Sequence, residues 1–410
     1  MNKKVLYLSY DGLTDPLGQS QVLPYVKGLS KLGYRFTILS CDKPDRYNKL
    51  KQQIQELCDE DTIEWISFPF TNKIPFVSKV LDLVRFKRLA LQLHKKNKYE
   101  LVHCRSYVAA EIGLLLKQKH DVKFLFDMRG FWADEKIDTK AWNVKNPLFR
   151  LLYKHYKNLE KKFLQQADAI TCLTTSAKNE IIRWGYLPEP IARLHIVPCC
   201  VNTDLFQSDS ISISEQKKFR LELNINENDY VINYLGSIGT WYMLSEMLDF
   251  FNVLLLTKPT AKFLFITGDE HEQIKSLAKE KNISIEKIII RQAQRNEVPV
   301  LLSLSAFSVY FIKPMYSKMA SSPTKLGEIM AMGIPVVCNA GIGDTEAIIH
   351  QYKAGNLIND FNMQSYQSAI ENISTAEYNA NTIRSGAIES FSLKNGIDSY
   401  NDIYSQVLAL

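Results

Sequence analysis

Residues 321–337 read Ser-Ser-Pro-Thr-Lys-Leu-Gly-Glu-Ile-Met-Ala-Met-Gly-Ile-Pro-Val-Val and carry clear signals for a helix followed by a strand. Ser322 can cap the helix by accepting a hydrogen bond from a first-turn N–H, and Pro323 suits the first helical position because its φ is fixed. Gly333 can adopt the left-handed conformation past the last helical residue, and Pro335 prevents the helix from continuing. The apolar residues that follow predict a short buried strand.

Two charged residues on this predicted helix point to a ligand. Lys325 lies in the first turn, where the helix dipole favours an anion and disfavours a cation. A phosphate held by Lys325 and by the free N–H groups of the first turn accounts for this position. Glu328 lies on the same side one turn deeper, where its carboxylate can accept hydrogen bonds from two ribose hydroxyls. The alternative is an ordinary surface pair of Lys325 and Glu328. The predicted nucleotide-binding residues of this stretch are Ser322, Pro323, Thr324, Lys325, Leu326 and Glu328.

The same stretch resembles the second half of the Glu-x7-Glu region of retaining glycosyltransferases of family 4, which have the GT-B fold. In the Ser-Pro-Thr-Lys variety of that region the second glutamate holds the donor ribose, and Glu328 takes that place. The first glutamate falls eight residues earlier, where this chain has Ala320. The resemblance implies an α/β protein with two Rossmann-like, doubly wound parallel-sheet domains that face a central cleft. It also implies a hexosyltransferase-type activity (EC 2.4) on a nucleotide-sugar donor, with UDP the expected nucleotide.

Length and composition indicate a two-domain globular protein. The chain has 410 residues, of which 46% are hydrophobic, and this is ample for two cores. Its seven cysteines lack Cys-x-x-Cys spacing and lie mostly in apolar runs, which predicts buried thiols in a reducing compartment. No apolar run is long enough for a signal sequence or a membrane span, so we expect a cytoplasmic protein. No metal-ligand motif stands out, so neither a metal nor a cofactor is expected.

The charge is distributed unevenly along the chain. Residues 1–200 contain 33 Lys+Arg against 21 Asp+Glu, a balance of +12, and residues 201–410 contain 17 against 23, a balance of −6. This asymmetry suggests that the first half faces an anionic partner. No nucleic-acid-binding motif is present, so the expected partner is an anionic membrane surface or a phosphate-bearing acceptor. The alternative is a lysine-rich surface without a partner.

In the first half, apolar strands alternate with helical stretches, which predicts a parallel sheet with ligands at the carboxyl ends of its strands. The loop at 11–21 follows the first strand. Gly18 would allow close approach of a ligand, and Gln19 would open the next helix with outward-pointing N–H groups. This loop lacks the Gly-x-Gly-x-x-Gly fingerprint of dinucleotide sites. In family 4 the corresponding loop reaches the donor sugar and diphosphate.

Two later strand ends carry polar clusters, His103 with Arg105 and Asp127 with Arg129. One cluster could be a core ion pair, but two at neighbouring strand ends suggest a cleft wall. Residues 127–135 resemble an Asp-Met-Arg-Gly-Phe-Trp-x-Asp-Glu segment of some family members, at the place where others carry a histidine that contacts the donor sugar. Asp127 and Arg129 are therefore the candidate catalytic residues of this half, together with Lys325 and Glu328. His103 is expected to be a packed or acceptor-side histidine.

The second half repeats the alternation from about residue 230. Its first strand leads into a glycine loop in which Gly236 and Ser237 are predicted to approach the donor phosphates. Most family members carry an Arg and a Lys in this loop, whereas this chain has neither. Lys325 and Lys313 are expected to supply the missing charge, and Arg291 is expected near the base or the phosphate. We place the acceptor-binding domain at 1–203, the donor-binding domain at 204–392 and a returning helix at 393–410.

Three functions are compatible with these features. The leading one is a retaining, metal-independent glycosyltransferase that acts on a saccharide or lipid-linked acceptor, in which lysines and a helix dipole stabilise the diphosphate leaving group. The second is a nucleotide-sugar epimerase of the same fold, which would convert the donor without an acceptor. The third is a catalytically inert nucleotide-sugar-binding subunit, suggested by Ala320 and the missing Arg/Lys pair. The first reading also predicts a cytoplasmic location, peripheral on the inner face of the membrane.

Overall fold

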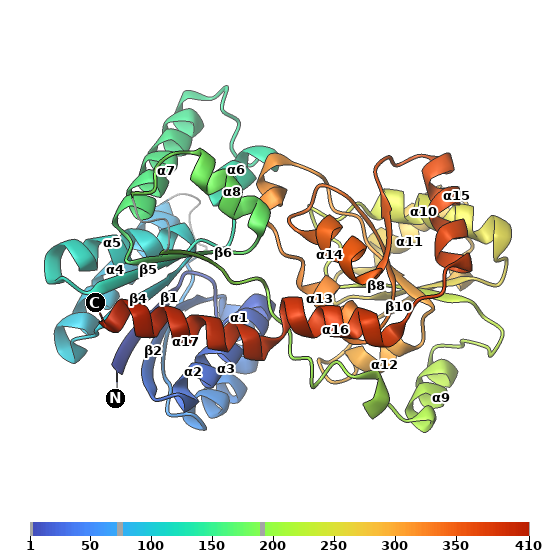
Figure 1. The fold of residues 1–410 in the computed structure, drawn as a ribbon, viewed down its shortest axis with the longest axis horizontal. Helices are drawn as coiled ribbons and strands as arrows, with labels where there is room; N and C mark the ends of the chain where they lie inside the picture. The colour runs from blue at the N-terminus through green and yellow to red at the C-terminus, as the bar shows by residue number, and fades with distance from the viewer. Residues whose placement is uncertain (1–2, 72–76, 189–192, 410) are drawn as a thin grey trace. The chain divides into compact units, whose positions relative to one another are not determined.

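The structure is a computed structural model that describes residues 3–71, 77–188 and 193–409 (Figure 1). It divides into two compact units, the first formed by Met1–Pro198 with Leu393–Leu410 and the second by Cys199–Ser392. The first unit thus ends at Pro198 rather than at residue 203. The reason is local, because Val201 donates a backbone hydrogen bond of 2.7 Å to Phe391 and forms a parallel bridge with Ser392.

The first unit is built on a seven-stranded parallel sheet with the order β3-β2-β1-β4-β5-β6-β7. The strands are β1 (Lys3–Ser9), β2 (Tyr34–Asp42), β3 (Glu64–Pro69), β4 (Leu101–Arg105), β5 (Lys123–Asp127), β6 (Ala169–Cys172) and β7 (Leu194–Ile196). The strand order reverses direction between β1 and β4, which makes the carboxyl ends of these two strands the topological switch point where ligands of open α/β sheets bind.

Helices accompany this sheet (Figure 1). They are α1 (Pro16–Gln21), α2 (Leu23–Lys31), α3 (Pro44–Asp59), α4 (Val77–Asn97), α5 (Ser106–His120), α6 (Trp132–Asp138), α7 (Pro147–Gln166), α8 (Thr175–Arg183) and α17 (Leu393–Ala409). The last of these comes from the end of the chain and packs beside α2, where a Cβ on Gly28 would lie 2.2 Å from Ile397 Cδ1. Tyr400 and Tyr404 of α17 are buried in the same unit.

The second unit is built on a six-stranded parallel sheet with the order β10-β9-β8-β11-β12-β13, so its switch point lies between β8 and β11. The strands are β8 (Val231–Leu235), β9 (Lys262–Ile266), β10 (Ile288–Arg291), β11 (Phe307–Val309), β12 (Val336–Asn339) and β13 (Gly355–Ile358). The helices are α9 (Ile213–Glu222), α10 (Leu244–Thr257), α11 (His271–Glu280), α12 (Val298–Ser303), α13 (Thr324–Ala331), α14 (Thr345–Tyr352), α15 (Met363–Thr375) and α16 (Ala380–Phe391). The prediction of two doubly wound parallel-sheet domains is confirmed.

The helix-and-strand stretch differs from its prediction in one respect. Helix α13 begins at Thr324 with Pro323 in the capping position, and no side chain caps it. Ser322 is not the cap, because its Oγ accepts a hydrogen bond of 3.2 Å from the Cys199 N–H. The helix end follows the prediction, since Gly333 has a φ of +69° and β12 begins three residues later at Val336.

The cysteines are as predicted, because all seven are free thiols and buried. Nowhere in the described parts of the chain is a helix both long and apolar enough to cross a lipid bilayer.

Candidate functional site

Lys325, near the start of α13, is buried in a cage of tyrosines. Its Nζ donates a hydrogen bond of 2.9 Å to Tyr234 Oη. The same atom lies 4.0 Å from the ring centroid of Tyr234, 3.6 Å from that of Tyr242 and 5.7 Å from that of Tyr310. Aromatic faces attract a cation, so the cage fixes where the amine can place a positive charge.

The cage lies at the switch point of the second sheet, since Tyr234 belongs to β8 and Tyr310 directly follows β11. The glycine loop after β8 is close by, because a Cβ on Gly236 would lie 3.3 Å from Lys325 Nζ. Gly236 itself has a φ of +106°, which other residues rarely adopt. The structure therefore brings Gly236 and Lys325 together, as the sequence predicts for a diphosphate site.

The next residue of this loop, Ser237, is anchored by an acidic side chain that the sequence analysis did not identify. Ser237 Oγ and the Ile238 N–H each donate a hydrogen bond of 2.6 Å to Asp269 Oδ2. Asp269 follows β9, the neighbouring strand of the sheet. These contacts hold the loop in one conformation beside the cage.

The charge state of Lys325 depends on its burial. Burial lowers the pKa of Lys325 well below its ordinary value of 10.5, although the carboxylates of Glu328 and Asp269 act in the opposite direction. Neither carboxylate forms an ion pair with Nζ within the described residues. The simple alternative of a surface Lys325–Glu328 pair is therefore wrong.

Glu328 has another partner, Arg295, which the sequence analysis missed. Glu328 is buried, and its Oε1 lies 2.6 Å from Arg295 Nη1. Burial raises the pKa of Glu328, whereas Arg295 and, to a smaller extent, Lys325 lower it. The Arg295 side chain is 47% exposed, so it can turn into solvent and release the carboxylate. The only sequence signal for Arg295 is its place in a polar loop after a strand.

Two other predicted donor-site residues do not join this group. Arg291 Nη2 forms ion pairs with Glu222 at 3.2 Å and with Glu297 at 3.3 Å. Lys313 is exposed, and its backbone N–H donates to the Trp241 carbonyl at 2.9 Å. Within the described residues, no contact connects either side chain to Lys325 or Glu328.

In the first unit, Asp127 lies at the end of β5 and is buried. Its Oδ1 accepts a hydrogen bond of 2.9 Å from Thr171 Oγ1, its Oδ2 lies 3.4 Å from His103 Nε2, and Arg129 Nη1 lies 3.9 Å from Oδ1. Burial opposes ionisation, but the pKa of Asp127 is nevertheless lowered to about 2, chiefly by Arg129 and His103. Asp127 is thus a carboxylate at neutral pH and a weak base.

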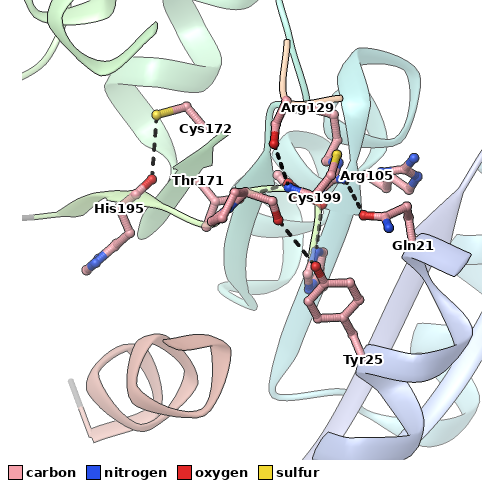
Figure 2. Close-up of polar contacts among 12 residues, drawn as sticks. Gln21, Tyr25, Arg105, Arg129, Thr171, Cys172, His195 and Cys199 are labelled. Atoms are coloured by element: carbon pink, nitrogen blue, oxygen red, sulfur yellow. Dashed lines mark hydrogen bonds and ion pairs between the residues drawn. The ribbon is translucent and has the colours of Figure 1, made fainter. Parts of the chain in front are cut away.

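His103 is a packed histidine, one of the two roles expected for it. Its Nδ1 lies 2.7 Å from Tyr404 Oη, and its ring centroid lies 4.3 Å from that of Tyr7. Burial lowers its pKa despite the nearby Asp127, so the imidazole is neutral at pH 7. Arg129, in contrast, contacts the end of α1, where its Nη2 donates a hydrogen bond of 3.2 Å to Gln21 Oε1 (Figure 2).

The prediction that Gln19 opens a helix is wrong. Helix α1 begins at Pro16, so Gly18 and Gln19 both lie inside it, and the Gln19 N–H donates to the Asp15 carbonyl at 3.0 Å. Gly18 is needed for close packing within the loop itself, because a Cβ there would lie 2.3 Å from the Gly12 carbonyl oxygen. The Gln19 N–H is therefore not free for a ligand, and the close approach of a ligand at Gly18 stays a prediction.

Two family models match consecutive parts of the chain. "Glycosyltransferase Family 4" matches residues 19–205, and "Glycosyl transferases group 1" matches residues 215–389. The chain is a glycosyltransferase with the GT-B fold, similar to family 4. No curated protein sequence matches this glycosyltransferase.

Solved structures share the fold of the whole glycosyltransferase. Sucrose-phosphate synthase from Thermosynechococcus elongatus has a TM-score of 0.76 at 15% identity, with 99% of each chain covered. A glycosyltransferase from Rickettsia africae has a TM-score of 0.73 at 17% identity, again with 99% of each chain covered. The Anabaena protein HepE in complex with UDP-glucose has a TM-score of 0.72 at 14% identity, with 99% of this chain and 100% of HepE covered.

Proposed function

We propose that this glycosyltransferase transfers a sugar from a UDP-linked donor to a saccharide or lipid-linked acceptor, with retention of configuration and without a metal ion. The observation that carries the proposal is the position of Lys325, buried in its tyrosine cage beside Gly236 and one turn from Glu328. The choice of UDP is supported by the neighbour HepE, which is known in complexes with UDP and with UDP-glucose.

In this proposal, the second unit binds the nucleotide. Lys325, the N-terminus of α13 and the loop of Gly236 and Ser237 bind the diphosphate, because a cation, a helix dipole and backbone N–H groups all favour an anion. Glu328 binds the ribose hydroxyls through its carboxylate. Since Arg295 occupies Oε1 of that carboxylate, the ribose either uses Oε2 or displaces Arg295 into solvent.

The site must stabilise the most charge when the glycosyl–phosphate bond breaks. The sugar then becomes oxocarbenium-like and the diphosphate gains negative charge. Lys325 meets that growing charge and so stabilises the transition state more than the ground state. Asp127 and Arg129 remain the proposed catalytic residues of the first unit, with Asp127 acting as a fixed negative charge because its pKa of about 2 makes it a poor proton acceptor.

Metal independence is proposed on the chemistry of the residues that are present. Across the described ranges, His, Cys, Asp and Glu side chains form no group of three that could bind a metal ion. The positive charge of Lys325 and the dipole of α13 can supply the stabilisation that a metal would otherwise provide. We further propose that the basic first unit brings the enzyme to the anionic inner face of the membrane, where a lipid-linked acceptor would be found.

Thermal-shift measurements with UDP and GDP, each with and without a chelator, test the donor site. A ligand at about one hundred times its dissociation constant stabilises the protein by about 2.7 kcal/mol, which is readily detected. We expect UDP to stabilise the protein equally with and without chelator. Stabilisation that requires a divalent metal would contradict the proposal. Mass spectrometry of products from a panel of nucleotide sugars and glycolipids then identifies the reaction, and conversion of a donor without an acceptor would indicate an epimerase.

A further inference from the structure

Arg105, the last residue of β4, is a buried cation, and part of its hydrogen-bonding capacity is not used within the described residues. Its side chain is only 6% exposed. Within the described residues, neither Nε nor Nη1 has a hydrogen-bond partner. The ion-pair partner of Arg105 is Asp11, whose Oδ2 lies 3.8 Å from Nε, beyond hydrogen-bond distance, and whose side chain is 56% exposed. Burying a guanidinium in this way costs free energy unless a ligand completes its hydrogen bonds.

The buried carboxylate nearby does not explain Arg105. Asp127 already accepts a hydrogen bond from Thr171 and interacts with His103 and Arg129, and no ion pair joins it to Arg105. Burial keeps His103 neutral. Two arginines and two carboxylates thus meet in this cluster, since Arg129 faces Asp127 and Arg105 faces Asp11. The exposed Asp11 lies beyond hydrogen-bond distance, so Nε and Nη1 of the buried Arg105 still lack an acceptor within the described residues.

The backbone around Arg105 also favours an anion. Helix α5 begins at the next residue, Ser106, and its N-terminus has neither a capping side chain nor an acidic residue in the first turn. Ser106 has a φ of +66° and Arg129 a φ of +58°, so two non-glycine residues at neighbouring strand ends hold a disfavoured conformation. Arg105 and Ser106 lie at the switch point between β1 and β4, where open α/β sheets bind ligands, and Arg129 follows the neighbouring strand β5.

We propose that Arg105, together with Arg129 and the N-terminus of α5, binds a phosphate group of the acceptor substrate. A guanidinium donates charge-assisted hydrogen bonds to phosphate oxygens, and Nε and Nη1 of Arg105 are donors without a partner within the described residues. Figure 2 shows Arg105 and Arg129 in the region of Gln21, to which Arg129 is hydrogen-bonded. The site is formed by residues of the first unit, whereas Lys325 belongs to the second. Only the assignment of the phosphate to the acceptor rests on the proposed function.

Calorimetric titration with inorganic phosphate tests the site directly. We expect the wild-type protein to bind phosphate, Arg105→Gln to bind it at least about tenfold more weakly, and Arg105→Lys to lie between them because lysine keeps the charge but loses the fork of donors. The matched control is Arg35→Gln, which changes an exposed arginine of the same sheet and should bind like the wild type. Glucose 6-phosphate and farnesyl diphosphate then distinguish a sugar-borne phosphate from a lipid-borne one, according to which binds more tightly than inorganic phosphate.

A stability measurement separates ligand binding from a structural role. Because Nε and Nη1 of Arg105 have no hydrogen-bond partner within the described residues, Arg105→Gln should not lower the thermal midpoint of the unliganded protein. A large decrease, an unchanged phosphate affinity in Arg105→Gln, or absence of phosphate binding in the wild type would each overturn the inference.

A titration with UDP distinguishes failure of the proposed phosphate site from failure of the proposed donor site. We expect Arg105→Gln to bind UDP like the wild type, because the nucleotide site is in the other unit. Loss of UDP affinity in Arg105→Gln would assign the anion to the donor and overturn the inference. The wild-type protein could instead bind phosphate through Arg105 and not bind UDP. This result would support the anion site and contradict the proposed donor site.

Discussion

Replacing Lys325 with Met tests whether the caged amine changes its protonation when the donor binds. Methionine keeps an unbranched apolar stem against Tyr234 and Tyr242 but removes the amine. In the unliganded protein, burial lowers the pKa of Lys325 well below 10.5. A diphosphate next to Nζ raises that pKa again, because a nearby anion favours the charged form. Donor binding should therefore take up a proton at pH values between the two pKa values of Lys325.

The same pKa shift predicts how stability changes with pH. The unfolded chain keeps the Lys325 proton up to about pH 10.5, whereas the folded protein loses it at lower pH, so the unfolded state binds more protons in this interval. The free energy of unfolding of the wild type consequently rises with pH there, by at most about 1.4 kcal/mol per pH unit. Lys325→Met removes this dependence but also removes the hydrogen bond to Tyr234, worth about 1 kcal/mol. The variant should thus be slightly less stable than the wild type above pH 10.5 and gain stability relative to it as the pH falls.

Calorimetric titration of UDP in two buffers with different ionisation enthalpies measures the proton uptake. We expect up to one proton per UDP for the wild type and none beyond that of UDP itself for Lys325→Met. UDP affinity should also fall at least about tenfold, because a charge-assisted hydrogen bond is worth about 1.5–3 kcal/mol. Equal proton uptake by both proteins, or unchanged UDP affinity in the variant, would refute the placement of Lys325 at the diphosphate.

Three further predictions follow from the other charged groups. Glu328→Ala should weaken UDP binding about tenfold in calorimetry while Arg295→Ala, which frees the same carboxylate, should not. Asp127→Asn should lower the free energy of unfolding at pH 7 by about 2 kcal/mol, since the pKa of Asp127 falls from 3.8 to about 2, and urea titrations should show that this difference is lost as the pH drops through about 2. The wild-type protein should sediment with anionic vesicles at low salt and be released by salt, with about 1 kcal/mol for each basic residue engaged; protein that stays in solution at low salt would contradict membrane binding.

The sequence predicted the fold well because its signals are local. Strands of a parallel sheet are buried on both faces, so runs such as Val5–Ser9 and Val231–Leu235 are mostly apolar, and the helices between them begin and end at recognisable residues. The left-handed Gly333 marked the end of α13 in this way. The helix start was misplaced because Ser322 bonds to Cys199, a residue far away in the sequence. A local capping rule cannot anticipate such a competitor.

The candidate site was predicted less completely because its contacts join distant strands. Lys325 and Glu328 were recognised from their positions on one helix. The tyrosine cage, however, comes from β8, the loop before α10 and the residue after β11, and Arg295 comes from the loop after β10. Likewise, the sequence showed Arg105 only as one of two polar residues, with His103, at the end of a strand. Only the structure shows that it is buried without a hydrogen-bond partner for Nε and Nη1.

Arg105 and Lys325 are informative when they are compared with a buried charge that has a full set of partners. Asp42 is fully buried and accepts hydrogen bonds from Thr14, Ser40 and Ser67. No comparable set of anionic or hydrogen-bonding partners surrounds Arg105 or Lys325 in the described residues, and each lies at the switch point of its own sheet. If charges were buried by chance, there would be no reason for both cations to lie at the edge of the sheet where ligands bind. A protein retains such unmatched charges where a ligand supplies the missing partner, and for two cations that partner is an anion. The substrates of a glycosyltransferase offer one in the donor diphosphate and, if Arg105 acts as proposed, a second in the acceptor.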